Sequence, residues 1–269
     1  MIRRRSWLVG AGAVVVLLLL VAGWLVWRWT ASDARPVGVA DAGRRFHQDH
    51  ADALGASTFV PAEGVYRYRG SGSESISKPA RSQAEGPEMP GTVTRRDDGC
   101  WTFRLDYSTN HWREWSYCTG GSTLVETGGR EWQRWDFVAF AVDNLSVTAC
   151  APPALVLAAD LQVGAVWSSE CRGTNTAAAG ETVSTGDRRY LGPATVEVAG
   201  TPVPVLHLRD QRRIRSAQQG SETTDFWITP EGLPVRVRQR IVVRSDSQIG
   251  RVTYHQAGHF TLASPSPVG

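Results

Sequence analysis

The sequence has almost no lysine and lacks the motifs of the common enzyme classes. Lys78 is the one lysine among 29 basic residues, a bias that indicates a GC-rich bacterial genome rather than a selected phosphate site. The sequence contains no G-x-S-x-G, H-E-x-x-H or Walker-type loop, and the S-x-x-K at Ser75 has no K-T-G partner. We therefore predict no catalytic residue and no cofactor.

The chain also has no net positive charge once the three N-terminal arginines are set aside. The net charge of +3 equals the charge of Arg3, Arg4 and Arg5, so that the remainder of the chain sums to zero. A nucleic-acid-binding domain needs a net or clustered excess of positive charge. The composition therefore argues against a nucleic-acid partner.

A long charge-free run follows these arginines. Residues Trp7 to Trp27 hold 21 residues without a charge, which as a helix would match a bilayer core of roughly 30 Å. Tryptophans lie at both ends, and the run is longer than the apolar part of a cleaved signal peptide. We predict a cytoplasmic N-terminus at 1–6 and an uncleaved transmembrane signal anchor at 7–29, with the rest of the chain outside a bacterial cell membrane.

Four cysteines lie in the exported part, and none forms a C-x-x-C pair that would indicate zinc or redox chemistry. An even number of cysteines in an oxidising compartment favours disulfides. Cys100 and Cys118 bracket one predicted hairpin. We expect them to pair with each other, and Cys150 to pair with Cys171.

Short, alternating, β-branched or aromatic segments dominate from Glu63 onward. They predict an all-β extracytoplasmic domain at 63–264, built as a curved antiparallel sheet of about ten to twelve strands, either a half-barrel or a sandwich. A stalk at 30–62, with a short helix around Arg44 to Leu54, precedes it. A disordered tail at 265–269 follows.

Two segments inside the β-domain interrupt the alternating pattern. The run 79–91 is rich in proline, glycine and charge, and it is typical of a long hairpin loop or lid. The run ALVLAADLQ, residues 154–162, indicates another short helix and divides the β-region into two halves.

The stretch CWTFRLDYSTNHWREWSYC predicts a hairpin with a three-residue loop centred on Thr109. This register places Cys100 opposite Cys118 and also predicts an aromatic pair and an ion pair, the cross-strand contacts that stabilise sheets. The aromatic pair is Phe103 with Trp115, and the ion pair is Arg104 with Glu114. Trp101, Phe103, Leu105, Trp115 and Tyr117 share one face, which is either core or the wall of a ligand-binding concavity.

The histidines give weak metal-binding signals. His47 and His50 would share a face if the stalk were helical, but histidines in a polar stalk are more commonly solvated. His255 and His259 lie about 13 Å apart in a strand, which is too far for one metal ion. His111 lies in the predicted hairpin turn, so we interpret it as a turn residue and assign no metal site.

Two strand-like segments carry basic residues on one face, and together they could contact anionic lipid headgroups or wall polymers. The alternative is a solvated face that Glu222, Asp225 and Asp246 neutralise. The predicted contact residues are His207, Arg209, Arg213, Arg236, Arg238 and Arg240.

From Leu161 to Arg238 the sequence resembles a family of bacterial, notably actinobacterial, membrane-anchored envelope β-proteins of undefined function. The shared features are VGAVW, then RRYLGPATVEVAGTPVPVLHLR, and then TTDFWITPEGLPVRVR after a polar turn. The residues at the recurring positions are Gly164, Trp167, Gly200, Trp227, Gly232 and Leu233. The order is similar to the half-barrels of periplasmic lipoprotein carriers, which hold acyl chains. The resemblance implies a curved sheet and supplies no catalytic residue.

Three functions remain open from the sequence. The leading hypothesis is a non-catalytic, membrane-anchored binding module for a lipid or an envelope component. The alternatives are a structural subunit of an envelope complex and an unrecognised hydrolase. The ligand-binding residues predicted by the first hypothesis are Trp101, Phe103, Trp115, Trp132 and Trp227.

Overall fold

The computed structural model describes residues 16–26, 33–49, 59–96, 98–247 and 250–268. Beyond the helical segment 16–26, the described chain contains a helix and thirteen strands. These are α2 (Val39–Asp49), β1 (Gly64–Ser77), β2 (Ala80–Glu85), β3 (Glu88–Arg95), β4 (Cys100–Ser108), β5 (His111–Gly120), β6 (Thr123–Asp136), β7 (Ala141–Ala158), β8 (Val166–Asn175), β9 (Ala178–Val198), β10 (Thr201–Ser216), β11 (Gln218–Ile228), β12 (Pro234–Ser247) and β13 (Gly250–Leu262).

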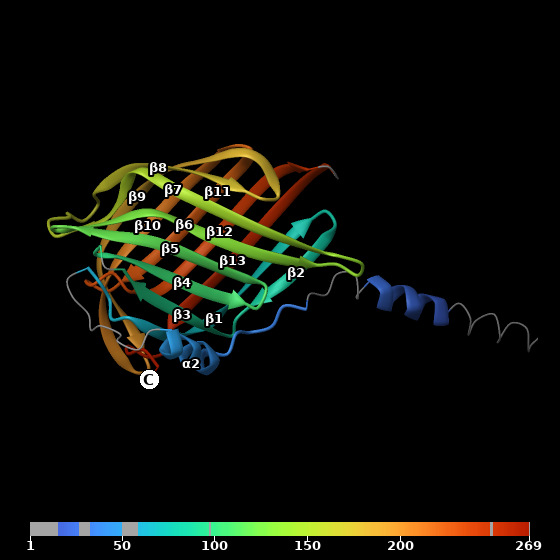
Figure 1. Cartoon of the computed structure of the whole chain (residues 1–269), viewed down its shortest axis with the longest axis horizontal. Coiled ribbons are helices and arrows are strands. Elements are labelled where there is room, and N and C mark those ends of the chain that lie inside the picture. The colour runs from blue at the N-terminus through green and yellow to red at the C-terminus, as the bar shows by residue number, and fades with distance from the viewer. Residues whose placement is uncertain (1–15, 27–32, 50–58, 97, 248–249, 269) are drawn as a thin grey trace, which may run out of the picture.

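The strands form one antiparallel sheet that closes on itself (Figure 1). Its order runs from β13 back to β3 and then to β1 and β2, and β13 also pairs with β1 from Tyr68↔Leu262 to Ile76↔Tyr254. In the part of the chain that the structure describes, this gives a closed barrel of twelve strands plus one extra strand, β2. The all-β prediction is confirmed, but the sheet is a closed barrel and not a half-barrel or a sandwich. Closure pairs both edges of the twelve barrel strands, whereas β2 pairs with β1 alone and keeps one edge.

Residues 79–91 form β2 and the start of β3, so the predicted loop or lid is wrong. Both strands lie along β1 in one register, with Ser77↔Ala80 at one end and Gly64↔Val93 at the other. The β2 side chains alternate between exposed and buried, but the buried ones are polar. A search for alternating hydrophobic residues therefore misses this strand.

The helix predicted at 154–162 is also wrong, because β7 continues through Ala158. Leu155 stands opposite Val125, and Leu157 stands opposite Leu124 on β6. A short apolar run fits a buried strand as well as a helix, and the pairing with β6 decides between them.

The hairpin of β4 and β5 has the predicted register along its length. Cys100 stands opposite Cys118 and the two form a disulfide, as do Cys150 and Cys171. The rings of Phe103 and Trp115 stack with centroids 5.7 Å apart. The turn differs, because Ser108 pairs with His111 and leaves a two-residue loop.

The predicted ion pair across this hairpin is wrong. Arg104 and Glu114 do stand opposite each other. However, Arg104 pairs with Asp106 on its own strand at 2.6 Å, and Glu114 pairs with Arg130 on β6 at 3.0 Å. On the outer face of a sheet, same-strand and diagonal partners compete with the residue directly opposite.

One half of the barrel interior, toward the Cys100 end of β4, is packed with aromatic and aliphatic side chains. We call it the apolar half. Trp101 and Phe103 are fully buried there, and the Trp101 indole donates a hydrogen bond to the Phe59 carbonyl at 3.0 Å. Strands from around the barrel contribute the remaining core residues, which include Tyr68, Met89, Leu105, Leu124, Tyr190, Val196, Leu208, Val235, Val237 and Phe260.

The α2 helix packs against the outside of the barrel next to β1 and β3 (Figure 1). Its buried residues Val39, Ala42 and Phe46 cluster with Val65 of β1, and Val268 of the C-terminal tail packs against the same cluster. The tail predicted to be disordered thus reaches this cluster, where the Val268 amide donates to the Val65 carbonyl at 2.7 Å. The helix predicted around Arg44 to Leu54 begins earlier, at Val39.

Much of the predicted N-terminal organisation lies outside the described residues, including 1–15, 27–32 and 50–58. Of the predicted anchor at 7–29, residues 16–26 are described, and they are helical with exposed side chains. Among the residues that the structure describes, none of the helices is both long enough and apolar enough to cross a bilayer. The anchor therefore stays a prediction.

Replacing Trp101 by Ala tests whether this aromatic face is packed core. We expect the free energy of unfolding to fall by about 3–5 kcal/mol, because the variant leaves a cavity and an unpaired Phe59 carbonyl. Chemical denaturation of the purified protein measures the loss. The matched control is Trp132→Ala on the outer face, which should cost about 1 kcal/mol or less. Equal losses for both variants would contradict a packed interior.

Candidate metal centre

The other half of the barrel interior, toward the turn between β4 and β5, is lined by polar side chains. We call it the polar half. Here the inward positions of five strands carry carboxylates, amides and one imidazole, and most are buried. The set consists of Glu74 (β1), Gln83 and Glu85 (β2), His111 (β5), Glu131 and Gln133 (β6), and Tyr254 and Gln256 (β13).

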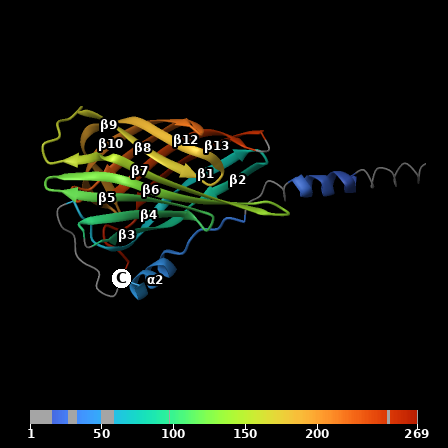
Figure 2. The same cartoon turned by 45° about the horizontal axis from the view of Figure 1, so that its top comes forward.

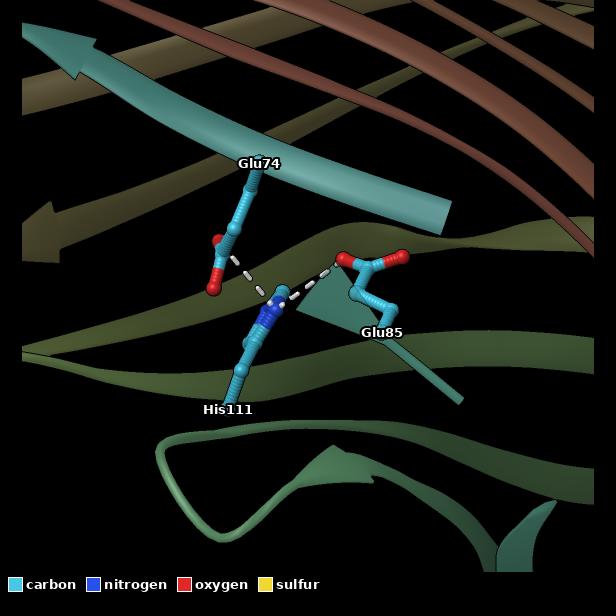
Figure 3. Close-up of side chains that lie close together, drawn as sticks. All are labelled: Glu74, Glu85 and His111. Atoms are coloured by element: carbon cyan, nitrogen blue, oxygen red, sulfur yellow. Dashed lines mark ion pairs between the residues drawn. The ribbon is translucent and has the colours of Figure 1, made fainter. Parts of the chain in front are cut away.

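His111 lies at the centre of this polar half, with two carboxylates pointing at its ring (Figure 3). Its Nδ1 is 3.2 Å from a Glu74 oxygen and 3.4 Å from a Glu85 oxygen. The His111 and Glu74 side chains are completely buried, and Glu85 is 3% exposed. The three residues offer ligand atoms that all lie within 4.8 Å of one another, so they could hold a metal ion.

A third carboxylate fixes the orientation of the ring. His111 Nε2 lies 2.9 Å from a Glu131 oxygen. In metal sites, a ligating histidine commonly donates its second ring N–H to a carboxylate, which fixes the tautomer and makes the other nitrogen a better ligand. The Glu131 contact therefore leaves Nδ1 as the nitrogen that faces Glu74 and Glu85.

The two candidate ligand carboxylates are held in place by side chains of the barrel wall. A Glu74 oxygen accepts hydrogen bonds from Gln133 at 3.0 Å and from the Tyr254 hydroxyl at 2.9 Å. A Glu85 oxygen accepts one from Gln256 at 2.6 Å. Carboxylates that bind a metal ion are commonly held in position by such hydrogen bonds.

Two of the candidate ligands each have an atom without a hydrogen-bond partner among the residues that the structure describes. His111 Nδ1 makes no hydrogen bond of normal geometry to either carboxylate, and Glu85 Oε2, which is not the oxygen that faces His111, accepts none. The Glu85 carboxylate occupies space that two glycines provide: a Cβ on Gly72 would lie 2.2 Å from Oε2, and one on Gly258 would lie 3.0 Å from it. A buried polar atom without a partner needs a physical explanation, and the chemistry of a metal ligand is one for His111 Nδ1.

The two separations from His111 Nδ1 are also compatible with a bound ion. Around an ion with bonds of about 2.0–2.1 Å, tetrahedral ligand atoms lie about 3.3 Å apart. The two separations from Nδ1, 3.2 and 3.4 Å, match that spacing. One imidazole and two carboxylates form a donor set that suits zinc, manganese or iron.

Burial and charge shift the pKa values of these groups in opposite directions. Burial raises the pKa of Glu85. Burial also acts to lower the pKa of His111, but the Glu74 charge and the contacts with the surrounding carboxylates raise it well above the usual value. For Glu131, burial acts to raise the pKa, but His111 and Arg113 hold it below the usual value. The site thus surrounds His111 with three carboxylates that favour its protonated ring, and a metal ion bound at Nδ1 would displace that proton. Arg113 forms its own ion pair with Glu222 at 2.8 Å.

A second buried polar cluster lies on β6, β9 and β10. The guanidinium of Arg188 contacts Asp210 at 2.6 Å and Glu126 at 2.7 Å, and Arg212 contacts Asp210 at 3.1 Å. Two arginines and two carboxylates balance each other in charge. We therefore interpret this cluster as an ion-pair network that supports the fold.

The aromatic residues predicted to bind a ligand do not come together. Trp101, Phe103 and Trp115 lie in the packed core, where they are at most 4% exposed. Trp132 stands opposite Trp112 on the outer face. Trp227 lies on the outer face as well, stacked on His207 with ring centroids 4.2 Å apart.

The basic residues predicted to contact an anionic surface lie on the outer face of β10 and β12. Asp225 neutralises much of their charge, because it contacts Arg209 at 2.8 Å, His207 at 3.0 Å and Arg238 at 3.0 Å. Arg238 and Arg240 also line an outer groove of about 780 Å³, next to Ser71 and His259 of the neighbouring strands.

Sequence patterns identify none of the three candidate ligands. The predicted hairpin places His111 in a turn, the predicted loop at 79–91 contains Glu85, and no predicted site includes Glu74. The one usable signal is the alternation that puts Gln83 and Glu85 on the same side of a strand, and the register of β1 with β2 places Glu74 opposite Gln83. No sequence pattern indicates that His111 lies close to Glu74 and Glu85, because their proximity depends on the curvature of the sheet.

Comparisons of the chain with protein-family models, with curated proteins and with solved structures found no match.

The Arg188 network predicts a pH-dependent stability. Burial acts to raise the pKa of Asp210, but Arg188 and Arg212 hold it below the usual value. Its stabilisation is therefore present above the unfolded-state pKa of about 3.9 and is lost as the pH falls through the folded-state pKa. We expect Asp210→Asn to lower the free energy of unfolding by about 3 kcal/mol at neutral pH, and by less in acid.

Urea denaturation at neutral pH and at about pH 3 measures both differences. The control is Asp246→Asn, which removes an exposed ion pair with Arg251 and should cost about 0–1 kcal/mol. A loss for Asp210→Asn that does not change with pH would contradict the network's role.

Proposed function

We propose that the protein is a membrane-anchored, extracytoplasmic barrel that binds a divalent transition-metal ion through Glu74, Glu85 and His111. The observation that carries this proposal is the convergence of two buried carboxylates on one imidazole nitrogen at 3.2 and 3.4 Å. A divalent ion would neutralise the buried carboxylates and would give His111 Nδ1, which has no hydrogen-bond partner among the described residues, an atom to bind.

The extracytoplasmic location rests on two features. All four cysteines form disulfides, which persist in oxidising compartments outside the cytoplasm. The charge-free run from Trp7 to Trp27, preceded by three arginines, supports a single span with its N-terminus in the cytoplasm.

Burial of the site supports binding without catalysis. Catalytic metal sites keep a coordination position open to substrate, whereas structural sites are closed. His111 and Glu74 have no solvent-exposed surface, and Glu85 is almost as deeply buried. This closure makes a hydrolase less favourable, and the packed aromatic residues of the apolar half favour a metal ion over an acyl chain.

The test is direct measurement of metal in the full-length protein. We expect elemental analysis of the purified protein, or titration of the chelator-treated protein with Zn²⁺, Mn²⁺ or Co²⁺, to show one bound ion per chain. An ion at 100 times its Kd should raise the free energy of unfolding by about 2.7 kcal/mol, which corresponds to roughly 5–10 °C in Tm.

Variants separate this site from adventitious binding. Glu85→Gln keeps the side-chain shape but removes a ligand charge and should weaken binding strongly. Glu131→Gln alters the orienting contact and should weaken binding about 10–100-fold. His259→Gln, on the outer face, is the matched control and should bind as the unmodified chain does. Absence of metal from the purified protein, together with no binding by the chelator-treated protein, would show that the cluster is an imidazolium held by carboxylates.

A further inference from the structure

The hairpin of β6 and β7 ends in a run of six apolar residues, FVAFAV at 137–142. Such turns are normally polar, because they lie in water. Here Val138 is 59% exposed, Phe140 is 56% exposed and Val142 is 38% exposed. The Phe137 and Phe140 rings contact each other with centroids 4.8 Å apart. We call residues 137–142 the apolar tip.

The apolar tip projects beyond the barrel wall. On one side, β5 begins at His111 opposite Gln133, and the last contact is the Arg134 amide with the Asn110 carbonyl at 2.8 Å. On the other side, the ladder between β7 and β8 ends at Ser146. From Arg134 to Val138 the ribbon extends about 13 Å past the strands it pairs with. On its inner face, Trp135 contacts Tyr254 and the Phe137 ring lies 5.9 Å from the Arg81 guanidinium, so the exposed part of the tip begins at Val138. Among the described residues, no other strand pairs with it there.

The N-terminal segment leaves the barrel beside the base of this hairpin. Arg35 and Thr109 exchange two hydrogen bonds, from the Arg35 amide to the Thr109 hydroxyl at 2.9 Å and from the Thr109 amide to the Arg35 carbonyl at 2.6 Å. Thr109 precedes Asn110, which contacts the hairpin. In both views, the helix 16–26 lies off the same end of the barrel as the β6–β7 hairpin (Figures 1 and 2).

The length of the chain between the predicted anchor and Arg35, compared with the projection of the hairpin, places the apolar tip near the membrane. If the anchor ends at Trp29, then Arg35 lies at most about 20 Å from the membrane interface, because the intervening chain has that reach. The projection of about 13 Å covers most of this distance. We infer that the apolar tip inserts into the outer interface of the same bilayer that holds the anchor. This inference rests on the anchored location in the proposed function.

The chemistry of the tip indicates apolar insertion rather than attraction to anionic lipid. At its base the Arg134 guanidinium lies 2.8 Å from an Asp136 oxygen and 3.6 Å from an Asp143 oxygen, and the Arg81 guanidinium lies 5.9 Å from the Phe137 ring. Two arginines and two aspartates leave no positive excess there. Interfacial segments bury apolar side chains about 5–10 Å into the boundary between headgroups and acyl chains. Binding should therefore be similar on zwitterionic and anionic membranes.

Insertion also gives the barrel an orientation. The anchor alone attaches the barrel to the bilayer at one point, whereas an anchor and an inserted hairpin together attach it at two. The polar half, which lies toward the same turn as Thr109, would then face the membrane, and the apolar half would face away from it.

The test places a fluorescent label at the tip of the full chain. Because all four native cysteines are in disulfides, Val138→Cys provides a single labelling site for an environment-sensitive dye. The protein is reconstituted in phosphatidylcholine vesicles, with and without phosphatidylglycerol and with lipids carrying a quencher near the headgroup. We expect a blue-shifted emission and a loss of emission with the quencher in both membranes.

Val163→Cys is the matched control, because Val163 is 66% exposed in the loop after β7, at the opposite end of the barrel. Its dye should keep the emission it has in water and should not be quenched. Phe140→Cys provides a second position in the tip if Val138→Cys folds poorly.

Three results would overturn the inference, and they can be told apart. A tip dye that behaves as in water, on protein that floats with the vesicles, refutes insertion and leaves the anchor intact. A tip dye that is shielded but not quenched by the lipid indicates a protein contact, such as a second copy of the chain. Protein that does not float with the vesicles refutes the anchored location as well.

Discussion

The pairing of β1 with β13 is the constraint on which the rest of the structure depends. It closes the sheet, so every strand acquires one face directed inward and one directed outward. It also places Glu74 opposite Gln256 and brings Tyr254 within reach of the same carboxylate. Without closure, these groups would lie at a sheet edge in water, where a carboxylate gains little from such contacts.

Closure produces an interior with two different halves. The apolar half is filled by aromatic and aliphatic side chains, and its burial supplies the main driving force for folding. The polar half carries carboxylates whose desolvation opposes folding unless each is paired or bound to a cation. Burying these carboxylates around His111 lowers the free energy of unfolding unless a cation offsets their desolvation. This loss of stability is the physical reason for proposing that the polar half binds a cation.

Local sequence patterns predicted some structural elements correctly and others incorrectly. The Cys100–Cys118 hairpin had a predictable register, because one pairing satisfied a disulfide and an aromatic contact at once. The ion pair expected in that register was wrong, since Arg104 found a partner on its own strand. The strand β2 escaped prediction because its inward residues are polar, and the buried strand at 154–158 looked helical because a short apolar run has no distinctive period.

The sequence by itself determined which residues of most strands share a face, since side chains alternate along a strand with a period of two. It also determined the disulfide-linked hairpin, whose partners lie close along the chain. Only the tertiary structure decided which inward residues meet. Glu74, Glu85 and His111 come from three strands and approach one another because the sheet curves and closes, and the alternation within a single strand carries no information about curvature.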